Sequence, residues 1–171
     1  MKKILSFLLV LGSCINSFAQ DSTKCNDKYF KDELLDRLAG KWQLTGNIGG
    51  SNVENNFSAT WVLNHQFMEL IFEDVASPPS YVAHVYIGYD CVSERYVAHW
   101  LDFFGGRISE TLGYGSASGQ TINLRFEYPD GPFINQLIYD PKNDSWQLHM
   151  TSKNSDGTWK LFGDEYLKRN K

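Results

Sequence analysis

The stretch that decides the fold is YVAHVYIGYDCVSERYVAHWLD, residues 81–102. It contains two runs rich in aromatic and β-branched residues, at 81–89 and 96–102, a composition typical of strands. The polar residues between the two runs begin with Asp90, whose side chain can bond the N–H groups of a turn. Two strands joined by a short turn form an antiparallel hairpin, so this stretch predicts one.

The same pattern continues on both sides of this hairpin. Short breaks rich in Gly, Asn, Asp, Pro and Ser separate strand-like runs, and no helix of useful length lies between them, which excludes parallel βαβ units. We expect ten strands, at 41–45, 57–63, 67–75, 81–89, 96–102, 108–114, 121–128, 133–139, 146–151 and 159–167.

We expect this antiparallel meander to close into a barrel, because closure removes the unpaired edges of an open sheet. The alternative is a two-sheet sandwich, which usually needs longer connections between its sheets. One short helix is expected at 33–38, where Asp32 can cap the first turn and Gly40 can end the helix. The predicted fold class is therefore all-β, an antiparallel up-and-down β-barrel of about ten strands with a short N-terminal helix.

Size and composition limit the classes of protein to which this chain can belong. A chain of 171 residues suits one domain, and 42% hydrophobic residues with 15% aromatic residues indicate a folded chain with an aromatic core. The net charge is −4, and no cluster of Lys and Arg is present. Because binding to a nucleic-acid backbone needs a concentrated basic surface, nucleic acid is not an expected partner.

The first residues have the pattern of a secretory signal peptide. Lys2 and Lys3 precede an apolar stretch, and the small residues Ser17 and Ala19 match a cleavage site. The apolar stretch is shorter than the roughly 20 residues that a membrane-spanning helix needs. Removing residues 1–19 takes two of the 16 basic residues and none of the 20 acidic ones, so the net charge becomes −6.

An alternative N-terminal signal is carried by Leu-Gly-Ser-Cys at 11–14, which resembles a bacterial lipobox and would make Cys14 a lipid-anchored first residue. Both interpretations predict export, to the periplasm or the medium in the first case and as an outer-membrane lipoprotein in the second. The expected organisation is a signal peptide at 1–19, a flexible tail at 20–31 and a barrel domain at 32–169. After cleavage at Ala19, Cys25 and Cys91 either form a disulfide, which export permits, or are two unrelated thiols.

Two stretches resemble known families. Gly40-Lys41-Trp42 is similar to the Gly-x-Trp opening of lipocalin-like (calycin) barrels. This resemblance implies that Gly40 and Trp42 close one end of the barrel under a basic residue of the last strand, Lys168 or Arg169, of which we assign Arg169.

The more specific stretch is GYDCVSERYVAHWLD at 88–102, followed by TLGYG at 111–115. Together they resemble the secreted bacterial family called domain of unknown function 1579, over residues 38–169. The chain departs from the family pattern at NHQFME, residues 64–69, where a glycine-rich turn is expected. The resemblance implies a barrel and assigns no activity.

The alternation of side chains along two strands suggests a ligand pocket. Residues two apart share a face of a strand, so Tyr96, Trp100 and Asp102 lie on the same face. If that face points inward, it forms an aromatic wall beside a carboxylate, which suits a small hydrophobic or amphipathic ligand. The alternative is a solid core in which Asp102 pairs with Arg107 or Arg125. The expected wall residues are Tyr86, Tyr96 and Trp100, and the expected polar anchors are Asp102, His84 and Arg125.

No catalytic or metal site stands out. The chain has no Gly-x-Ser-x-Gly motif, and its four histidines, at 65, 84, 99 and 149, lack the spacing of zinc ligands. We expect no metal and no cofactor; haem held by a single histidine, as in some related barrels, is the less favoured alternative. The expected function is an exported binding module for a small hydrophobic or amphipathic molecule. The alternatives are a ligand-free structural or protein-interaction barrel and, third, an uncharacterised enzyme.

Overall fold

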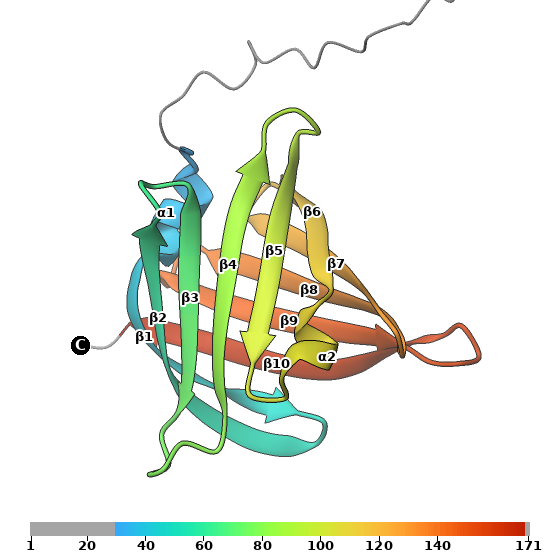
Figure 1. Ribbon diagram of the computed structural model, residues 1–171. Helices are drawn as coiled ribbons and strands as arrows, with labels where there is room; N and C mark the ends of the chain where they lie inside the picture. The colour runs from blue at the N-terminus through green and yellow to red at the C-terminus, as the bar shows by residue number, and fades with distance from the viewer. Residues whose placement is uncertain (1–29, 170–171) are drawn as a thin grey trace, which may run out of the picture.

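The computed structural model describes residues 30–169 (Figure 1). The predicted signal peptide, Cys14 and Cys25 lie outside the described residues. The described chain forms ten strands and two short helices. These elements are α1 (Glu33–Leu38), β1 (Gly40–Ile48), β2 (Ser51–Val62), β3 (Phe67–Asp74), β4 (Val82–Asp90), β5 (Arg95–Asp102), α2 (Gly106–Ser109), β6 (Leu112–Ser118), β7 (Thr121–Tyr128), β8 (Gly131–Asp140), β9 (Ser145–Lys153) and β10 (Trp159–Arg169).

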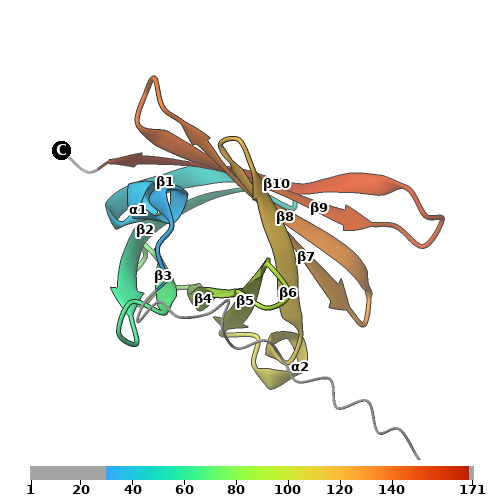
Figure 2. The same cartoon turned by 90° about the horizontal axis from the view of Figure 1, so that it is seen from above.

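The ten strands form a closed barrel in which each strand pairs antiparallel with its neighbour in sequence. The ring closes where β1 pairs with β10, with Leu44 opposite Leu167. Figure 2 shows the ring of strands from the end that carries α1. The prediction of a ten-stranded antiparallel barrel is confirmed, and the sandwich alternative is wrong. Within residues 30–169, no helix is long and apolar enough to cross a membrane.

Side-chain hydrogen bonds explain several of the turns. Asp90 Oδ1 accepts from the backbone N–H of Val92 at 3.0 Å, and Asp140 Oδ1 accepts from that of Lys142 at 2.9 Å. Each aspartate therefore ends one strand and shapes the turn into the next. Cys91 lies in the β4–β5 turn and is disulfide-bonded. The predicted pairing of Cys91 with Cys25 stays a prediction, because Cys25 lies outside the described residues.

Two strands begin at least four residues away from their predicted first residues. The second strand begins at Ser51 and not at 57, because Gly49 and Gly50 form a tight turn with φ values of +58° and +90°. The sixth strand begins at Leu112 and not at 108, because residues 106–109 form α2. This helical turn follows a sharp bend in which Asp102 Oδ1 accepts from the N–H of Phe104 at 3.0 Å.

Helix α1 covers one end of the barrel. Asp32 Oδ1 accepts from the N–H groups of Leu34 and Leu35, both at 2.9 Å, so it caps the helix as predicted. Leu35 and Leu38 are completely buried. The upper end of the barrel in Figure 1 therefore carries α1 and the β4–β5 hairpin, and the lower end carries α2 and the β3–β4 connection.

Alternation along the strands decides which residues form the core. On β4, Ala83, Val85 and Ile87 are buried and face inward. On β5, Tyr96 and Ala98 are buried, so the face that also carries Trp100 points into the barrel. The sequence alone left this choice of face open.

Two glycines of the family-like stretches make room for aromatic rings, Gly88 on the outer face of β4 and Gly113 inside the barrel. A Cβ on Gly88 would lie 2.6 Å from Cε1 of Phe67, and a Cβ on Gly113 would lie 2.5 Å from Cζ of Phe126. Both distances are far below a van der Waals contact. The stretches GYD and TLGYG are therefore explained by packing at these two positions.

Candidate functional site

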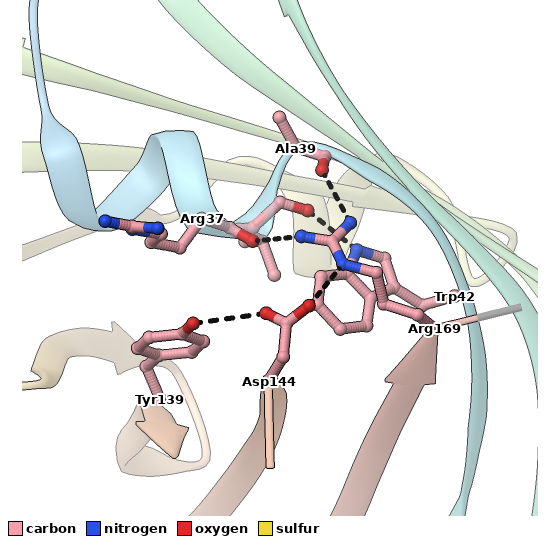
Figure 3. Close-up of polar contacts among 7 residues, drawn as sticks. Arg37, Ala39, Trp42, Tyr139, Asp144 and Arg169 are labelled. Carbon is pink, nitrogen blue, oxygen red and sulfur yellow. Dashed lines mark hydrogen bonds and ion pairs between the residues drawn. The ribbon is translucent and has the colours of Figure 1, made fainter. Parts of the chain in front are cut away.

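The residues predicted to close the barrel come together at the α1 end (Figure 3). The guanidinium of Arg169 lies 4.0 Å from the centre of the Trp42 ring. It donates to the carbonyl oxygens of Ala39, at 3.1 Å, and Arg37, at 3.0 Å. It also pairs with Asp144, Nε to Oδ2, at 2.7 Å.

A hydrogen bond also fixes the indole of Trp42, since its Nε1–H donates to the carbonyl oxygen of Leu38 at 2.7 Å. Gly40 is needed beside this cluster, because a Cβ there would lie 2.7 Å from Nη1 of Arg169. Together with Arg169 and the buried leucines of α1, these residues seal this end of the barrel. Lys168 faces the other way and is exposed.

The opposite end of the barrel contains a cavity of about 640 Å³. Its lining comes from the ends of the strands near the β1–β2, β3–β4 and β7–β8 connections, from the segment between β5 and β6, and from β9 and β10. Nearly half of the residues that line the cavity are aromatic. The aromatic residues are Phe72, Tyr81, Trp100, Phe103, Phe104, Phe126, Tyr128, Phe133 and Phe162.

Trp100 and Tyr81 form one wall of this cavity. The Nε1–H of Trp100 donates to the hydroxyl oxygen of Tyr81 at 3.2 Å, and the Trp100 ring packs against Phe72 with centroids 5.1 Å apart. Burial raises the pKa of Tyr81 far above its usual range, and burial raises the pKa of Tyr128 to about 12. Both tyrosines are therefore neutral, hydrogen-bonding groups at physiological pH.

Three polar side chains are buried against this apolar lining. Asn55, Asn135 and Glu165 are 5%, 2% and 5% exposed, and all three line the cavity. Oδ1 of Asn135 has no hydrogen-bond partner among the described residues. Burial raises the pKa of Glu165 to about 7, and no hydrogen bond to its carboxyl group is found within residues 30–169. Buried polar groups are usually paired, so these two mark the place where a ligand or water would bond.

Asp102 also lines the cavity, closer to its mouth. Burial raises the pKa of its carboxyl group, while a hydrogen bond from the backbone N–H of Phe104 acts in the opposite direction. Within residues 30–169 Asp102 forms no ion pair with Arg107 or Arg125, so the predicted alternative of such a pair is wrong. Arg125 lies on the outer face of β7, where it pairs with Glu127 at 2.6 Å.

The mouth of the cavity is apolar and exposed. Phe103 and Phe104, in the bend after β5, are 58% and 67% exposed, and they pack against each other with centroids 4.4 Å apart. Phe162 on β10 is also exposed, at a bulge where the pairing with β9 shifts by one residue. An apolar molecule could therefore approach the cavity over an apolar rim.

The structure places the sequence-predicted wall residues in three different locations. Trp100 and Asp102 line the cavity. Tyr96 faces the interior at the sealed end, where its hydroxyl donates to Oδ2 of Asp32, so it is not a wall of this cavity. The hairpin of β4 and β5 spans the length of the barrel, which explains why residues on one face of it reach opposite ends.

His84 and Tyr86 lie on the outer face of β4, so their prediction as pocket residues is wrong. Their neighbours Val85 and Ile87 point inward, and alternation turns His84 and Tyr86 outward. Both bond Oε1 of Glu69 on β3, His84 Nδ1 at 3.1 Å and the Tyr86 hydroxyl at 2.7 Å. The bond with His84, followed by that from Tyr86, lowers the pKa of Glu69.

The prediction of Arg125 as a polar anchor of the pocket is wrong for the same reason. Leu124 and Phe126, its neighbours on β7, are buried and face inward. None of the four histidines lines the cavity. They bond instead to Phe30, Glu69, the carbonyl of Ser109 and Asp164.

Sequence reasoning missed Glu165, Asn135 and Asn55. For Glu165 a signal was present, because an inward Arg169 requires by alternation that Leu167 and Glu165 also point inward. The stretch FINQLIY at 133–139 gives no such signal, since both of its faces carry apolar residues and one amide.

Comparison with known proteins gives one assignment. No curated protein sequence matches this chain. Residues 30–169 match the family described as "Protein of unknown function (DUF1579)". The match includes α1, all ten strands, the sealed end and every residue that lines the cavity. The chain therefore belongs to the DUF1579 family of proteins of unknown function.

Proposed function

We propose that this protein is a binding module that holds one small amphipathic molecule in the cavity at the α2 end of the barrel. A volume of about 640 Å³ lies within the usual range for ligand pockets, roughly 300–1,000 Å³. The lining also has the usual composition of such pockets, a mostly apolar surface with a few polar groups. The observation that carries the proposal is the buried Oδ1 of Asn135, a residue of the cavity lining, which has no hydrogen-bond partner among residues 30–169.

The two ends of the barrel differ in a way that supports this proposal. At the sealed end, large side chains such as Trp42 and Trp146 are completely buried and fill the interior. At the other end, the aromatic residues stand along the walls and leave the cavity between them. A ten-stranded barrel is wider than an eight-stranded one, which has room for one small ligand. The lipocalin-like resemblance of Gly40-Lys41-Trp42 agrees with a binding role.

The N-terminal pattern adds a proposal on location. We propose that the protein is exported to a compartment outside the cytoplasm. A carrier for poorly soluble molecules is useful there. Mass analysis of the N-terminus of protein from its native host tests this. A chain beginning at Gln20 supports cleavage by the general signal peptidase, and an acylated Cys14 supports a lipoprotein. An intact Met1 contradicts export.

Native mass spectrometry of protein purified from its own host tests the binding proposal. We expect a co-purifying small molecule that is retained by Trp159→Ala and lost by Trp100→Ala. Trp159 is the matched control, because it is partly exposed and does not line the cavity. Circular dichroism checks that both variants fold.

The ligand-free alternative predicts a different result. The native protein would then have the mass of the polypeptide alone. Its tryptophan fluorescence would also stay unchanged on addition of fatty acids, haem, isoprenoids, long-chain alcohols and long-chain amines. That combination would overturn the binding proposal.

A further inference from the structure

We propose that the cavity selects amphipathic molecules whose head group donates hydrogen bonds and carries no negative charge, with long-chain alkyl amines as the preferred class. The inference rests on the binding function proposed above and narrows its ligand. Two observations carry it independently. The residues that line the cavity include buried acceptor groups with no hydrogen-bond partner among the described residues, and this described lining contains no basic side chain.

The first observation concerns hydrogen bonding. Oδ1 of Asn135 is buried and unpaired among the described residues, and the Glu165 carboxyl group is buried without a hydrogen bond inside residues 30–169. Both groups are acceptors when Glu165 is ionised. A ligand that satisfies them must therefore donate hydrogen bonds, as an ammonium or hydroxyl group does and a carboxylate does not.

The second observation concerns charge. The acidic residues Asp74, Asp102 and Glu165 are among those that line the cavity, and no Lys, Arg or His is found among its lining residues in the described chain. The arginine at the sealed end, Arg169, is engaged by backbone carbonyls and Asp144. A carboxylate ligand would therefore meet like charges without a counter-ion, whereas an ammonium would meet opposite charges.

The arrangement along the strands places these acceptors at the floor of the cavity. Two residues closer to the sealed end, each of the three strands carries a buried apolar side chain: Phe57 after Asn55, Leu137 after Asn135 and Leu167 after Glu165. The mouth is instead formed by exposed aromatic rings. An amphipathic molecule would enter head first, with its head group on the floor and its chain along the aromatic walls.

The ionisation of Glu165 supports the same preference for a positively charged head group. Burial raises the pKa of this carboxyl group to about 7, and the negative charges of Asp102 and Glu165 add to the effect of burial on Tyr81. A nearby ammonium favours the carboxylate form of an acid. An amine bound at the floor would thus stabilise the ionised form that burial disfavours.

A matched pair of fluorescent probes tests whether the cavity rejects a negatively charged head group. N-phenyl-1-naphthylamine is neutral and carries an N–H donor, and 8-anilinonaphthalene-1-sulfonate has the same ring system with a sulfonate. At pH 8 we expect the neutral probe to bind at least about tenfold more tightly. Dodecylamine, dodecanol and dodecanoate then compete for the bound neutral probe, and we expect their affinities to fall in that order.

Two variants locate the effect within the cavity. Glu165→Gln removes the charge at the floor of the cavity and keeps the shape of the side chain, so we expect it to reduce the advantage of dodecylamine over dodecanol to the share that Asp74 and Asp102 contribute. Asn135→Leu removes the unpaired acceptor, so we expect it to weaken the binding of both molecules. Glu127→Gln is the matched control, because Glu127 is an exposed carboxylate on the outer face of β7. It should change none of the affinities.

The possible failures are distinguishable. If neither probe binds the folded protein, the proposed function itself fails. If the neutral probe binds and dodecanoate displaces it as well as dodecylamine does, the binding function stands and the inferred head-group preference is wrong. An amine preference of the same size in Glu165→Gln as in the wild type also overturns the inference, since Glu165 at the floor of the cavity would then play no part in it.

Discussion

Gly46 of β1 lies directly opposite Glu165 of β10, and the missing side chain of the glycine makes room for the carboxyl side chain. A Cβ on Gly46 would lie 2.9 Å from Cγ of Glu165 and 2.2 Å from the carbonyl oxygen of Asp164. Both Gly46 and Glu165 are on the inward face of their strands. The floor of the cavity therefore depends on a glycine in the neighbouring strand.

Gly46→Ala should consequently destabilise the protein. The added methyl group clashes with backbone on β10, and overpacking of this kind costs about 1–3 kcal/mol of the free energy of unfolding. Urea unfolding measures the difference. Gly106→Ala is the control, because a Cβ at that position has no atom within 4 Å beyond its chain neighbours and the backbone of its own helix. Equal stabilities of the two variants would show that the close packing of β1 on β10 is not as described.

Glu165 should make the stability of the fold depend on pH. Its pKa is raised from an ordinary value of 4.5 to about 7 by burial, so between these values the folded state binds more protons than the unfolded state. The free energy of unfolding therefore falls as the pH rises from about 4.5 to about 7 and then levels off. The loss is on the order of 3 kcal/mol.

Comparison with Glu165→Gln isolates this contribution. The other titratable residues that line the cavity are Asp74, Tyr81, Asp102 and Tyr128, and they are common to both proteins. Urea unfolding at pH 5 and pH 8 should show that the variant gains stability relative to the wild type as the pH rises. A constant difference between the two proteins across this range would contradict a raised pKa of Glu165.

The sealed end gives an independent prediction. Arg169→Ala removes two hydrogen bonds to backbone carbonyls and the contact with the Trp42 ring, so it should lower the free energy of unfolding by about 1–3 kcal/mol. Lys168→Ala is the matched control on the exposed face and should change it by less than about 0.5 kcal/mol. Thermal unfolding of the two variants at equal temperatures would contradict the role of Arg169.

The comparison of sequence and structure shows what local patterns can determine. Strand-like runs separated by turn residues were sufficient for the ten strands, because hairpin formation depends on neighbouring residues. The Gly40-Lys41-Trp42 resemblance placed Trp42 and Arg169, which lie 127 residues apart, in one cluster. The helical turn at α2 was missed, since the bend that creates it depends on the side chain of Asp102.

The cavity was predicted less well, for a physical reason. On β4 and β7 both faces carry large side chains, so composition did not distinguish His84, Tyr86 and Arg125 from their inward neighbours. Closure of the barrel sets which face is inside, and closure depends on pairing between distant strands. Glu165 and Asn135 were missed because a polar residue on a strand is usually exposed.

The binding of a ligand in the cavity is the central claim, and methionine methyl NMR tests it most directly. Of the three methionines, Met150 lines the cavity and Met68 is completely buried outside its lining, whereas Met1 lies outside the described residues. The protein is labelled with [¹³C-methyl]methionine and titrated with N-phenyl-1-naphthylamine. We predict a saturable shift of the Met150 resonance with an unchanged Met68 resonance. An unchanged Met150 resonance at saturating probe, or equal shifts of both resonances, would contradict the account.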